Sequence, residues 1–545
     1  MANNRDTPVL IAGGGPVGMT LALNLARYGI KSLLVERNTT TTSAPKMDLT
    51  NGRSMELFRR LGLIESLRAV GVPEDNCFDI AWITSLAQHE LHRFKYPSSR
   101  ERQGQIRAIN DGSFTQEAGM RVSQIVIEPV LKTAIDANPL IDVRFGTSFE
   151  RIVSQDPSSV VAEIRDVKSD RLQTIRCGYL AGCDGGGSRV RRQLGIDLEG
   201  SESVATAYMV HFRSDARDLL QRWGTTWHYQ SSFGTMIAQN DHDIWTLQCI
   251  RPPGSDLSAI DPRALLEEWA GRKFEYEILQ ANPWDAHFVV AERFQRGRLI
   301  LAGDAAHQFV PTGGYGMNSG MADAADLAWK LAALLQGWGG PSLIEAFEAE
   351  RKPTAWFHLT ASSRHVGVRI AIDQAYSEAG DLHGDDSSAR ARRAALGRKI
   401  AELGNIENES WGVEHGYRYD LSPIIASEPN PPPIDPITYR PSTWPGARLP
   451  HVYLNDGISI HDKLGLYFTL IMFADLDAHG FEEAAARLRI PLKVLRIAQA
   501  GLREIFERDI LLVRPDQHIA WRGDTLPSDC ARILIQASGN ATGAR

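Results

Sequence analysis

The chain has 545 residues, of which 43% are hydrophobic and 23% are charged, a composition typical of globular proteins. Its length favours two to four domains. Its 59 basic and 66 acidic residues give a net charge of -7, which argues against a nucleic-acid partner because such a partner requires a basic surface. We see no secretory signal and no run of ~18 apolar residues. We therefore expect a cytoplasmic protein without membrane contact.

The first predicted elements form a βαβ unit. Residues 7–12 (TPVLIA) are short and apolar and predict a strand, residues 19–28 have apolar positions at helical spacing, and residues 31–35 predict a second strand that ends at Glu36. A glycine-rich turn joins the first strand to the helix. This order of strand, turn, helix and strand is typical of a dinucleotide-binding unit.

The spacing of the turn glycines supports that interpretation. In Gly13-x-Gly15-x-x-Gly18, the first glycine permits a tight turn, the second lets a pyrophosphate approach the backbone, and the third lets helix and strand pack closely. The helix N-terminus offers free N–H groups to the phosphates. Glu36 lies where an acidic side chain can accept the ribose hydroxyls. The motif does not distinguish FAD from NAD.

The middle of the chain has a different pattern. Residues 223–231, 234–239 and 243–250 alternate between apolar and polar positions, with tight turns between them, and predict antiparallel strands. Helical patterns return at residues 262–272 and 321–336. The chain is therefore expected to be α/β first, more antiparallel in its middle, and α/β again afterwards.

A polar and proline-rich segment precedes the last part of the chain. Residues 376–445 include a run of three prolines at 431–433, which predicts a linker with stiff, extended pieces. A new alternation of strands and helices then predicts a separate α/β domain. Its expected elements are strands at 467–473, 492–497 and 510–514 and a helix at 481–488.

A second glycine-rich motif identifies the nucleotide. A predicted strand at 298–302 leads to Gly303 and Asp304, and a loop with further glycines leads to a helix that begins near Asn318. Asp304 is placed to bond a ribose or ribityl chain. The glycines let the backbone approach a flat ring system, and the helix N-terminus favours the negative charge of a reduced flavin. The pattern therefore favours FAD.

The string GDAAH, followed by P, GGYGMN and DAADLAWKL, resembles the FAD-binding signature of the flavoprotein aromatic hydroxylases, which include para-hydroxybenzoate hydroxylase and phenol hydroxylase. The string around Asp184-Gly185 is similar to the family's Asp-Gly motif, and residues 121–124 (RVSQ) are similar to the segment whose Gln contacts the flavin. Residues 445–523 resemble the C-terminal thioredoxin-like domain of the phenol-hydroxylase branch. That segment has no C-x-x-C pair, so thiol–disulfide chemistry is not expected.

The resemblance implies an α/β fold: a Rossmann-like FAD-binding domain, an inserted and mainly antiparallel β-sheet substrate domain, and a thioredoxin-like α/β domain. The expected divisions are 1–75, 111–190 and 291–375 for the FAD-binding domain, 76–110 and 191–290 for the substrate domain, 376–440 for a linker or helical connection, and 441–545 for the thioredoxin-like domain.

The resemblance also implies an activity. The chain is expected to be an FAD-dependent monooxygenase that hydroxylates a phenolic ring, with NADPH or NADH and O2, through a flavin hydroperoxide. Epoxidation, Baeyer–Villiger insertion and decarboxylative hydroxylation are alternatives on the same scaffold. A non-catalytic binding protein is an alternative of another class, against which the intact Asp184, Asp304, Gly313 and Gly314 argue. A homodimer and no metal site are expected.

The residues expected to contact the cofactors come from these motifs and from the segment PKMDLTNGRSME. They are Gly13, Gly15, Pro16, Val17, Gly18, Glu36, Arg37, Lys46, Arg53, Gln124, Asp184, Gly185, Gly303, Asp304, Pro311, Gly313, Gly314, Gly316, Met317 and Asn318.

Asp48 is the expected catalytic residue. It lies five residues before Arg53, and in phenol hydroxylase an active-site Asp precedes the matching Arg by the same interval. A phenolate is a better nucleophile than a phenol, so a base near the phenol oxygen is expected. A buried carboxylate beside an apolar ring is expected to have a raised pKa. The alternative is that Asp48 caps a turn or pairs with Lys46 or Arg53.

The predicted antiparallel strands supply the expected substrate pocket. Trp227 and Tyr229 alternate on one strand face, so both are expected to face the pocket and His228 to point away. Ordinary packing within the sheet is the alternative for each candidate. The full set of pocket candidates is Met209, His211, Trp227, Tyr229, Gln239, Trp245, Pro311 and Tyr315.

Overall fold

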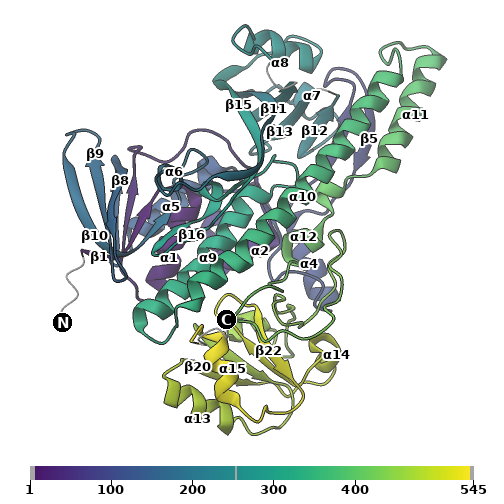
Figure 1. Ribbon diagram of the computed structural model, residues 1–545. Coiled ribbons are helices and arrows are strands. Elements are labelled where there is room, and N and C mark those ends of the chain that lie inside the picture. The colour runs from purple at the N-terminus through teal and green to yellow at the C-terminus, as the bar shows by residue number, and fades with distance from the viewer. Residues whose placement is uncertain (1–5, 233, 252–254, 541–545) are drawn as a thin grey trace.

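The structure is a computed structural model that describes residues 6–232, 234–251 and 255–540. Figure 1 shows two large sheets, long helices that run between them, and a smaller C-terminal domain below. The predicted fold class is confirmed. The exact domain limits stay predictions, and the first and last five residues of the chain lie outside the described residues.

The first sheet has a parallel centre. Its β1 (Thr7–Ala12) pairs with β2 (Ser32–Glu36) on one side and with β10 (Leu172–Gly182) on the other. The central strands are apolar along their length because helices cover the sheet and exclude water. The other strands of the sheet are β7 (Ile141–Phe145), β8 (Thr147–Gln155), β9 (Val160–Asp166), β16 (Gln295–Arg296) and β17 (Leu299–Leu301).

Helices and short segments pack around this sheet. Residues 315–336 form helix α9, which packs against α1 (Pro16–Arg27). Helix α9 begins at Tyr315, three residues before the expected start. The remaining elements of this part are β3 (Leu49–Thr50), α2 (Gly52–Arg60), α3 (Ile64–Arg68), α4 (Ser99–Ile109), β6 (Met120–Arg121), α5 (Gln124–Asp136), α6 (Arg189–Gln193), η1 (Gly303–Ala305), α9 (Tyr315–Gln336) and α10 (Ser342–Glu378).

The second sheet is antiparallel except where β12 pairs with β4. One face packs against α8 (Pro262–Ala270) in a separate apolar core. The opposite face meets α10, where Arg369 donates to Thr235 Oγ1 at 2.9 Å. In spatial order the strands are β18 (His307–Gln308), β15 (Glu277–Ala291), β11 (Leu198–Arg213), β14 (Ile244–Arg251), β13 (Gly234–Ala238), β12 (His228–Ser231), β4 (Ile80–Ile83) and β5 (Glu90–Phe94), and α7 (Arg217–Leu220) lies between β11 and β12 in sequence.

Much of the expected linker is helical. Helix α10 continues past residue 375, where a boundary was expected, and α11 (Ser387–Leu403) packs against α10 and β5. Figure 1 shows these two helices side by side at the upper right. The chain then passes through η2 (Ile406–Asn408) and α12 (Trp411–His415) before the proline-rich segment. Among the described residues, no helix combines the length and apolarity needed to cross a bilayer. The expected homodimer stays a prediction.

The C-terminal domain has a four-stranded sheet. Strands β19 and β20 are parallel, whereas β21 and β22 continue the sheet in antiparallel pairs. This is the βαβ–ββα arrangement of a thioredoxin-like domain. Its elements are η3 (Ile460–Lys463), β19 (Phe468–Met472), α13 (His479–Leu488), β20 (Leu492–Arg496), α14 (Leu502–Phe506), β21 (Ile510–Val513), β22 (Ile519–Gly523) and α15 (Cys530–Ala537).

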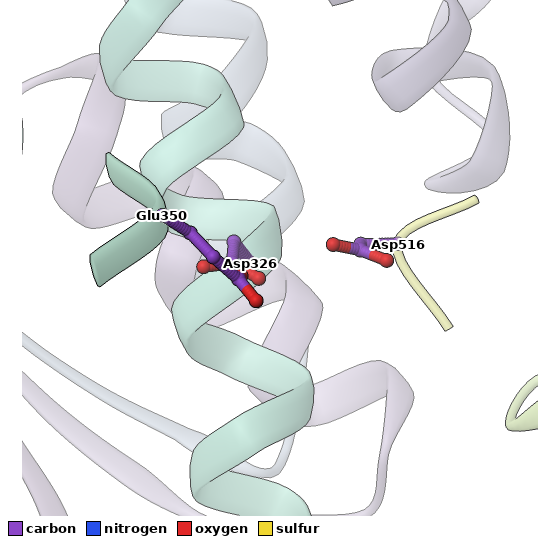
Figure 2. A group of neighbouring side chains, drawn as sticks. All are labelled: Asp326, Glu350 and Asp516. Atoms are coloured by element: carbon purple, nitrogen blue, oxygen red, sulfur yellow. The ribbon is translucent and has the colours of Figure 1, made fainter. Parts of the chain in front are cut away.

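A buried charge cluster joins this domain to α9 and α10. Figure 2 shows Asp516 approaching Asp326 and Glu350 from the C-terminal domain. The carboxylate oxygens lie within 4.8 Å of one another, a spacing compatible with a metal ion, but two cations of the chain already bond to them. Arg514 donates to Glu350 at 2.6 Å and to Asp516 at 2.6 Å, and Lys330 donates to Asp326 at 2.6 Å.

The cluster holds three carboxylates that share two cations, so it carries one excess negative charge when all five groups are ionised. Burial raises the pKa of Asp326 to about 7, with Lys330 opposing and Glu350 adding to the rise. Arg514 holds the pKa of Glu350 down to about 2, against the effect of burial. The excess charge is therefore relieved when a proton resides on Asp326.

Replacing Arg514 with Met is expected to lower the free energy of unfolding by about 3–5 kcal/mol, because the buried Glu350 and Asp516 lose their shared cation. Chemical denaturation measures the change. The matched control is Arg503→Met, which removes half-exposed ion pairs with Asp509 and Asp524 and is expected to cost less than about 1 kcal/mol. Equal denaturation midpoints for the Arg514 variant and the wild type contradict the role of the cluster.

Candidate active site

A cavity of about 940 Å³ follows the carboxyl edge of the first sheet. It is lined by the residues that follow β1, β2, β10 and β17, because parallel strands all end at this edge. Most of the predicted cofactor residues line it. They are Gly13, Gly15, Pro16, Val17, Glu36, Arg37, Lys46, Gln124, Asp184, Gly185, Asp304, Pro311, Gly314, Gly316 and Met317.

The three glycines of the first motif have different surroundings. Gly13 has a φ of +110°, and a Cβ there would lie 2.2 Å from the Cys183 carbonyl oxygen. A Cβ on Gly18 would lie 2.0 Å from the Gly13 carbonyl oxygen, so this glycine allows the helix to approach the strand. A Cβ on Gly15 would meet no protein atom within 4 Å. Gly15 therefore opens to the cavity at the N-terminus of α1.

Two acidic side chains of the cavity differ in their contacts. Glu36 is held in place, since its carboxylate accepts from the Gly14 and Asn38 backbone N–H groups at 2.8 and 2.9 Å. Asp304 faces the cavity, and no hydrogen bond from a described residue reaches its carboxylate. Burial raises the pKa of Asp304, while His307 and Lys46 lower it. A carboxylate without a partner fits the hydroxyl groups of a ribityl or ribose chain.

Asp184 has local partners. Its carboxylate accepts from Ser188 Oγ and from the backbone N–H groups of Arg189 at 2.7 Å and Val190 at 3.1 Å, so it caps the start of α6. Asp184 lines the cavity, but its carboxylate oxygens already accept hydrogen bonds from the N–H groups at the start of α6. The predicted contact of Asp184 with a nucleotide is therefore not visible in its hydrogen bonds.

The remaining predicted cofactor residues lie outside the cavity wall. Gly18 and Gly303 provide close packing, since a Cβ on Gly303 would lie 2.8 Å from Val17 Cγ2. Gly313 has a φ of +85° and lies against the Tyr315 ring. Arg53 is buried against the C-terminal domain, where it donates to Glu56 at 3.1 Å and to the carbonyl oxygen of Asp516 at 2.8 Å.

The Asn318 side chain links the start of helix α9 to the segment that carries Asp48. Its side-chain oxygen accepts from the Asn51 N–H at 3.1 Å, and its side-chain nitrogen donates to the carbonyl oxygens of Leu49 at 3.1 Å and Gly314 at 2.7 Å. Asn318 therefore fixes the loop before α9 and the Asp48 segment relative to each other.

The Asp48 carboxylate contacts two ring N–H donors at the start of β12. Its Oδ2 accepts from Trp227 Nε1 at 2.6 Å, and His228 Nε2 lies 3.3 Å away. Burial raises the pKa of Asp48, but hydrogen bonds from His228 and Trp227 and the charges of His228 and Arg121 outweigh it, so the pKa is lowered. The expected raised pKa is therefore wrong, because two donors compensate the desolvation.

The prediction that Tyr229 faces the substrate pocket and that His228 points away from it is also wrong. Tyr229 is fully buried in the core beneath α8, and His228 contacts Asp48 on the other face. Trp227 does not follow the alternation of side chains along the strand, because it precedes β12, which begins at His228. Side chains alternate along a strand, so this start reverses the predicted assignment of His228 and Tyr229.

The other pocket candidates divide between the two faces. Trp245 packs in the core beneath α8, whereas Met209 and His211 alternate with the residues of that core and so face the opposite side. His211 bonds Thr246 Oγ1 at 2.9 Å. Tyr315 is buried and bonds His365 at 2.9 Å. Gln239 follows the end of β13, and Pro311 lines the large cavity.

Comparison with known proteins assigns the family. The FAD binding domain family matches residues 6–362, and the aromatic-ring hydroxylase C-terminal family matches residues 442–541. The chain belongs to the flavoprotein aromatic hydroxylases. It is an FAD-dependent monooxygenase that hydroxylates aromatic substrates, with NAD(P)H and O2 as co-substrates. The recognition made from the motifs is therefore confirmed.

Full-length relatives agree. The FAD-dependent monooxygenase apdD of Emericella nidulans is 36% identical over 97% of this chain and 90% of its own. The 2,4-dichlorophenol 6-monooxygenase of Cupriavidus pinatubonensis is 29% identical over 98% and 96%. The rebeccamycin biosynthetic enzyme RebC with reduced flavin superposes with a TM-score of 0.88 at 32% identity, covering 98% of this chain and 99% of that chain.

Two glycine variants test the cofactor site. Gly15→Ala is expected to fold with an unchanged apoprotein melting temperature and to bind FAD at least ~10-fold more weakly, because its methyl group enters the space next to the helix N-terminus. Gly18→Ala is expected to destabilise the apoprotein itself by about 1–3 kcal/mol through overpacking. Flavin absorbance and thermal unfolding measure the two effects. The opposite assignment of effects contradicts the roles given to these glycines.

Proposed function

We propose that the enzyme hydroxylates a phenolic ring held beside Asp48, between the loop that precedes α9 and strand β12. The main support for this proposal is that Trp227 and His228 hold the Asp48 carboxylate next to Leu49. Leu49 in turn packs against the flavin-side loop, since a Cβ on Gly314 would lie 3.6 Å from its side chain. A ring beside Asp48 therefore lies close to the predicted flavin position.

The cavity residues would hold FAD, with Glu36 and Asp304 toward its hydroxyl groups and the N-termini of α1 and α9 toward its pyrophosphate and ring. When bound and reduced by NAD(P)H, FAD supplies the activated oxygen that is transferred to the ring. The protein's own contribution is to orient the ring, exclude water and remove the phenolic proton.

The geometry favours His228 as the acceptor of that proton. Asp48 stays ionised because its pKa is lowered, so it orients the imidazole by accepting a hydrogen bond from Nε2. This bond leaves Nδ1 as a bare acceptor. Nδ1 is buried and has no hydrogen-bond partner among the described residues. We infer that Nδ1 takes the phenolic proton while Asp48 stabilises the resulting imidazolium, the division of roles found in Asp–His pairs.

Substitution of either member tests the proposal. Asp48→Asn and His228→Gln are each expected to lower kcat for phenols by about 10²–10⁴-fold, the usual contribution of a positioned acid or base. FAD content is expected to stay unchanged, because neither residue lines the flavin cavity. The assay follows NAD(P)H oxidation and peroxide together over a panel of phenols. Asp215→Asn, an exposed residue of the same sheet domain, serves as control.

Retained kcat in both variants contradicts the proton-transfer roles. Product analysis with labelled O2 separates ring hydroxylation from the alternative oxygen insertions. A phenol that is consumed without a ring-hydroxylated product contradicts the proposed reaction itself.

The lowered pKa of Asp48 predicts a pH dependence. A carboxyl group whose folded pKa lies below its unfolded value of about 3.9 contributes stability above that value and loses it as the pH falls through the folded pKa. The difference in unfolding free energy between wild type and Asp48→Asn is therefore expected to shrink as the pH falls below about 4. Denaturation series at fixed pH values measure it. A difference that does not shrink at acid pH contradicts the lowered pKa of Asp48.

A further inference from the structure

A second cavity of about 120 Å³ adjoins the proposed reaction site. We call it the side chamber and define it by Leu49, Phe78, Phe114, Trp227, Trp411 and Glu414 among its lining residues. It touches the reaction site at two points. Trp227 lines the chamber and donates to Asp48, and Leu49 lies between the chamber and the loop that carries Gly314. A substrate ring beside Asp48 can therefore extend into the chamber.

The chamber has the size and walls suited to a ring. An apolar protein cavity of ~150 Å³ accommodates benzene, and the side chamber is only slightly smaller. Its walls include the rings of Phe78, Phe114, Trp227 and Trp411. Aromatic walls favour a flat ring through stacked and edge-to-face contacts.

One end of the chamber is polar and lacks partners. Glu414 lines it, and no described residue donates a hydrogen bond to its carboxylate. Burial raises the pKa of Glu414 to about 7, while the charge of Arg102 lowers it. The Arg102 guanidinium lies 4.7 Å from the centre of the Trp411 ring and 5.5 Å from that of Phe114, so it packs on the aromatic wall.

His415, the next residue, adds a second polar group without a hydrogen-bond partner. It lines the chamber, is 5% exposed, and neither ring nitrogen has a hydrogen-bond partner among the described residues. Burial lowers the pKa of His415 to about 3, with Arg448 acting in the same direction and Glu56 and the Ser113 backbone opposing. The imidazole is therefore neutral and offers one donor and one acceptor. Buried polar groups normally have partners, so the unpartnered His415 ring, beside the half-buried Glu414 carboxylate in the same cavity wall, points to a ligand.

We propose that the substrate is a two-ring phenol whose second ring occupies the side chamber and presents an N–H or O–H group to Glu414 and His415. This inference rests on the proposed function, because it places the phenolic ring beside Asp48. It assigns a specificity role to α12, in the segment that the sequence pattern predicts as a linker. A simple phenol leaves the chamber unfilled and its polar end without partners.

Binding to the FAD-loaded enzyme tests the proposal with three probes: phenol, biphenyl-4-ol and 4-(imidazol-4-yl)phenol. Each dissociation constant is read from the perturbation of flavin absorbance. Biphenyl-4-ol is expected to bind at least ~10-fold tighter than phenol, because it buries a second ring. The imidazole compound is expected to bind a further ~10-fold tighter, because it donates a hydrogen bond to the unpartnered Glu414 carboxylate.

Two variants separate the contributions. Glu414→Gln keeps the shape but removes the charge, and it is expected to reduce the ~10-fold gain of the imidazole compound over biphenyl-4-ol, while the gain of biphenyl-4-ol over phenol remains. Ala118→Leu fills the chamber from a wall position and is expected to abolish both gains without changing the affinity for phenol. Glu402→Gln, on the exposed face of α11, is the matched control. If Ala118→Leu fails to retain FAD, the Glu414 variant decides.

The outcomes distinguish this inference from the proposed function. Equal affinities for phenol and biphenyl-4-ol in the wild type overturn the side chamber as a ring site, and an unchanged imidazole preference in Glu414→Gln overturns the role of its polar end. Both results leave phenol hydroxylation intact. If no phenol perturbs the flavin or is hydroxylated, the proposed function fails instead.

Discussion

The contacts of the Asn318 side chain hold the proposed reaction site in place relative to the flavin cavity. From the first turn of α9 it bonds the backbone of Leu49, Asn51 and Gly314. On its other side the same segment pairs with β6, and the N–H of Val122, the residue after β6, donates to the Asp48 carbonyl oxygen at 2.8 Å. Backbone held from both sides leaves little freedom to Asp48. Positioning of this kind is a large part of catalysis when the cofactor performs the oxygen transfer.

The segment also connects the catalytic part to the C-terminal domain. Helix α2 begins just after Asn51, and its Glu56 accepts from Arg448 Nε at 2.9 Å in the buried junction. Burial raises the pKa of Glu56, but Arg448, His461 and other donors lower it well below its ordinary value. A buried charge without its partner is costly. The buried Arg448–Glu56 pair therefore holds the C-terminal domain against α2, the helix that follows the segment bearing Asp48.

The proposed division of labour between Asp48 and His228 follows from desolvation and its compensation. Burial by itself raises the pKa of Asp48, but hydrogen bonds from His228 and Trp227 and the charges of His228 and Arg121 lower it. An ionised orienter requires a separate proton acceptor, and His228 Nδ1 is the adjacent candidate. The side chamber bears on specificity in the same way, since the buried His415 ring has no hydrogen-bond partner among the described residues and lines the chamber beside Glu414.

The sequence by itself determined the features that depend on local chemistry. The glycine spacing and the strand at Thr7–Ala12 predicted the nucleotide unit, and the strand Phe468–Met472 was predicted to within a residue at each end. Glycine requirements and apolar periodicity act between neighbours in the chain, so they are visible without the fold. The family resemblance added the class of reaction and pointed to Asp48.

Only the tertiary structure decided what surrounds those residues. The lowered pKa of Asp48 depends on donors that lie 179 and 180 positions away in the chain. Which side chains of β12 face Asp48 depends on where the strand begins, and alternation alone cannot locate that residue. The sequence therefore did not predict the contact of His228 with Asp48, and it wrongly placed Tyr229 in the pocket. Helix α12 resembled a linker because its polar residues face a chamber built by distant segments. Burial, pKa and facing are properties of the packed neighbours, and those neighbours are brought together only by folding.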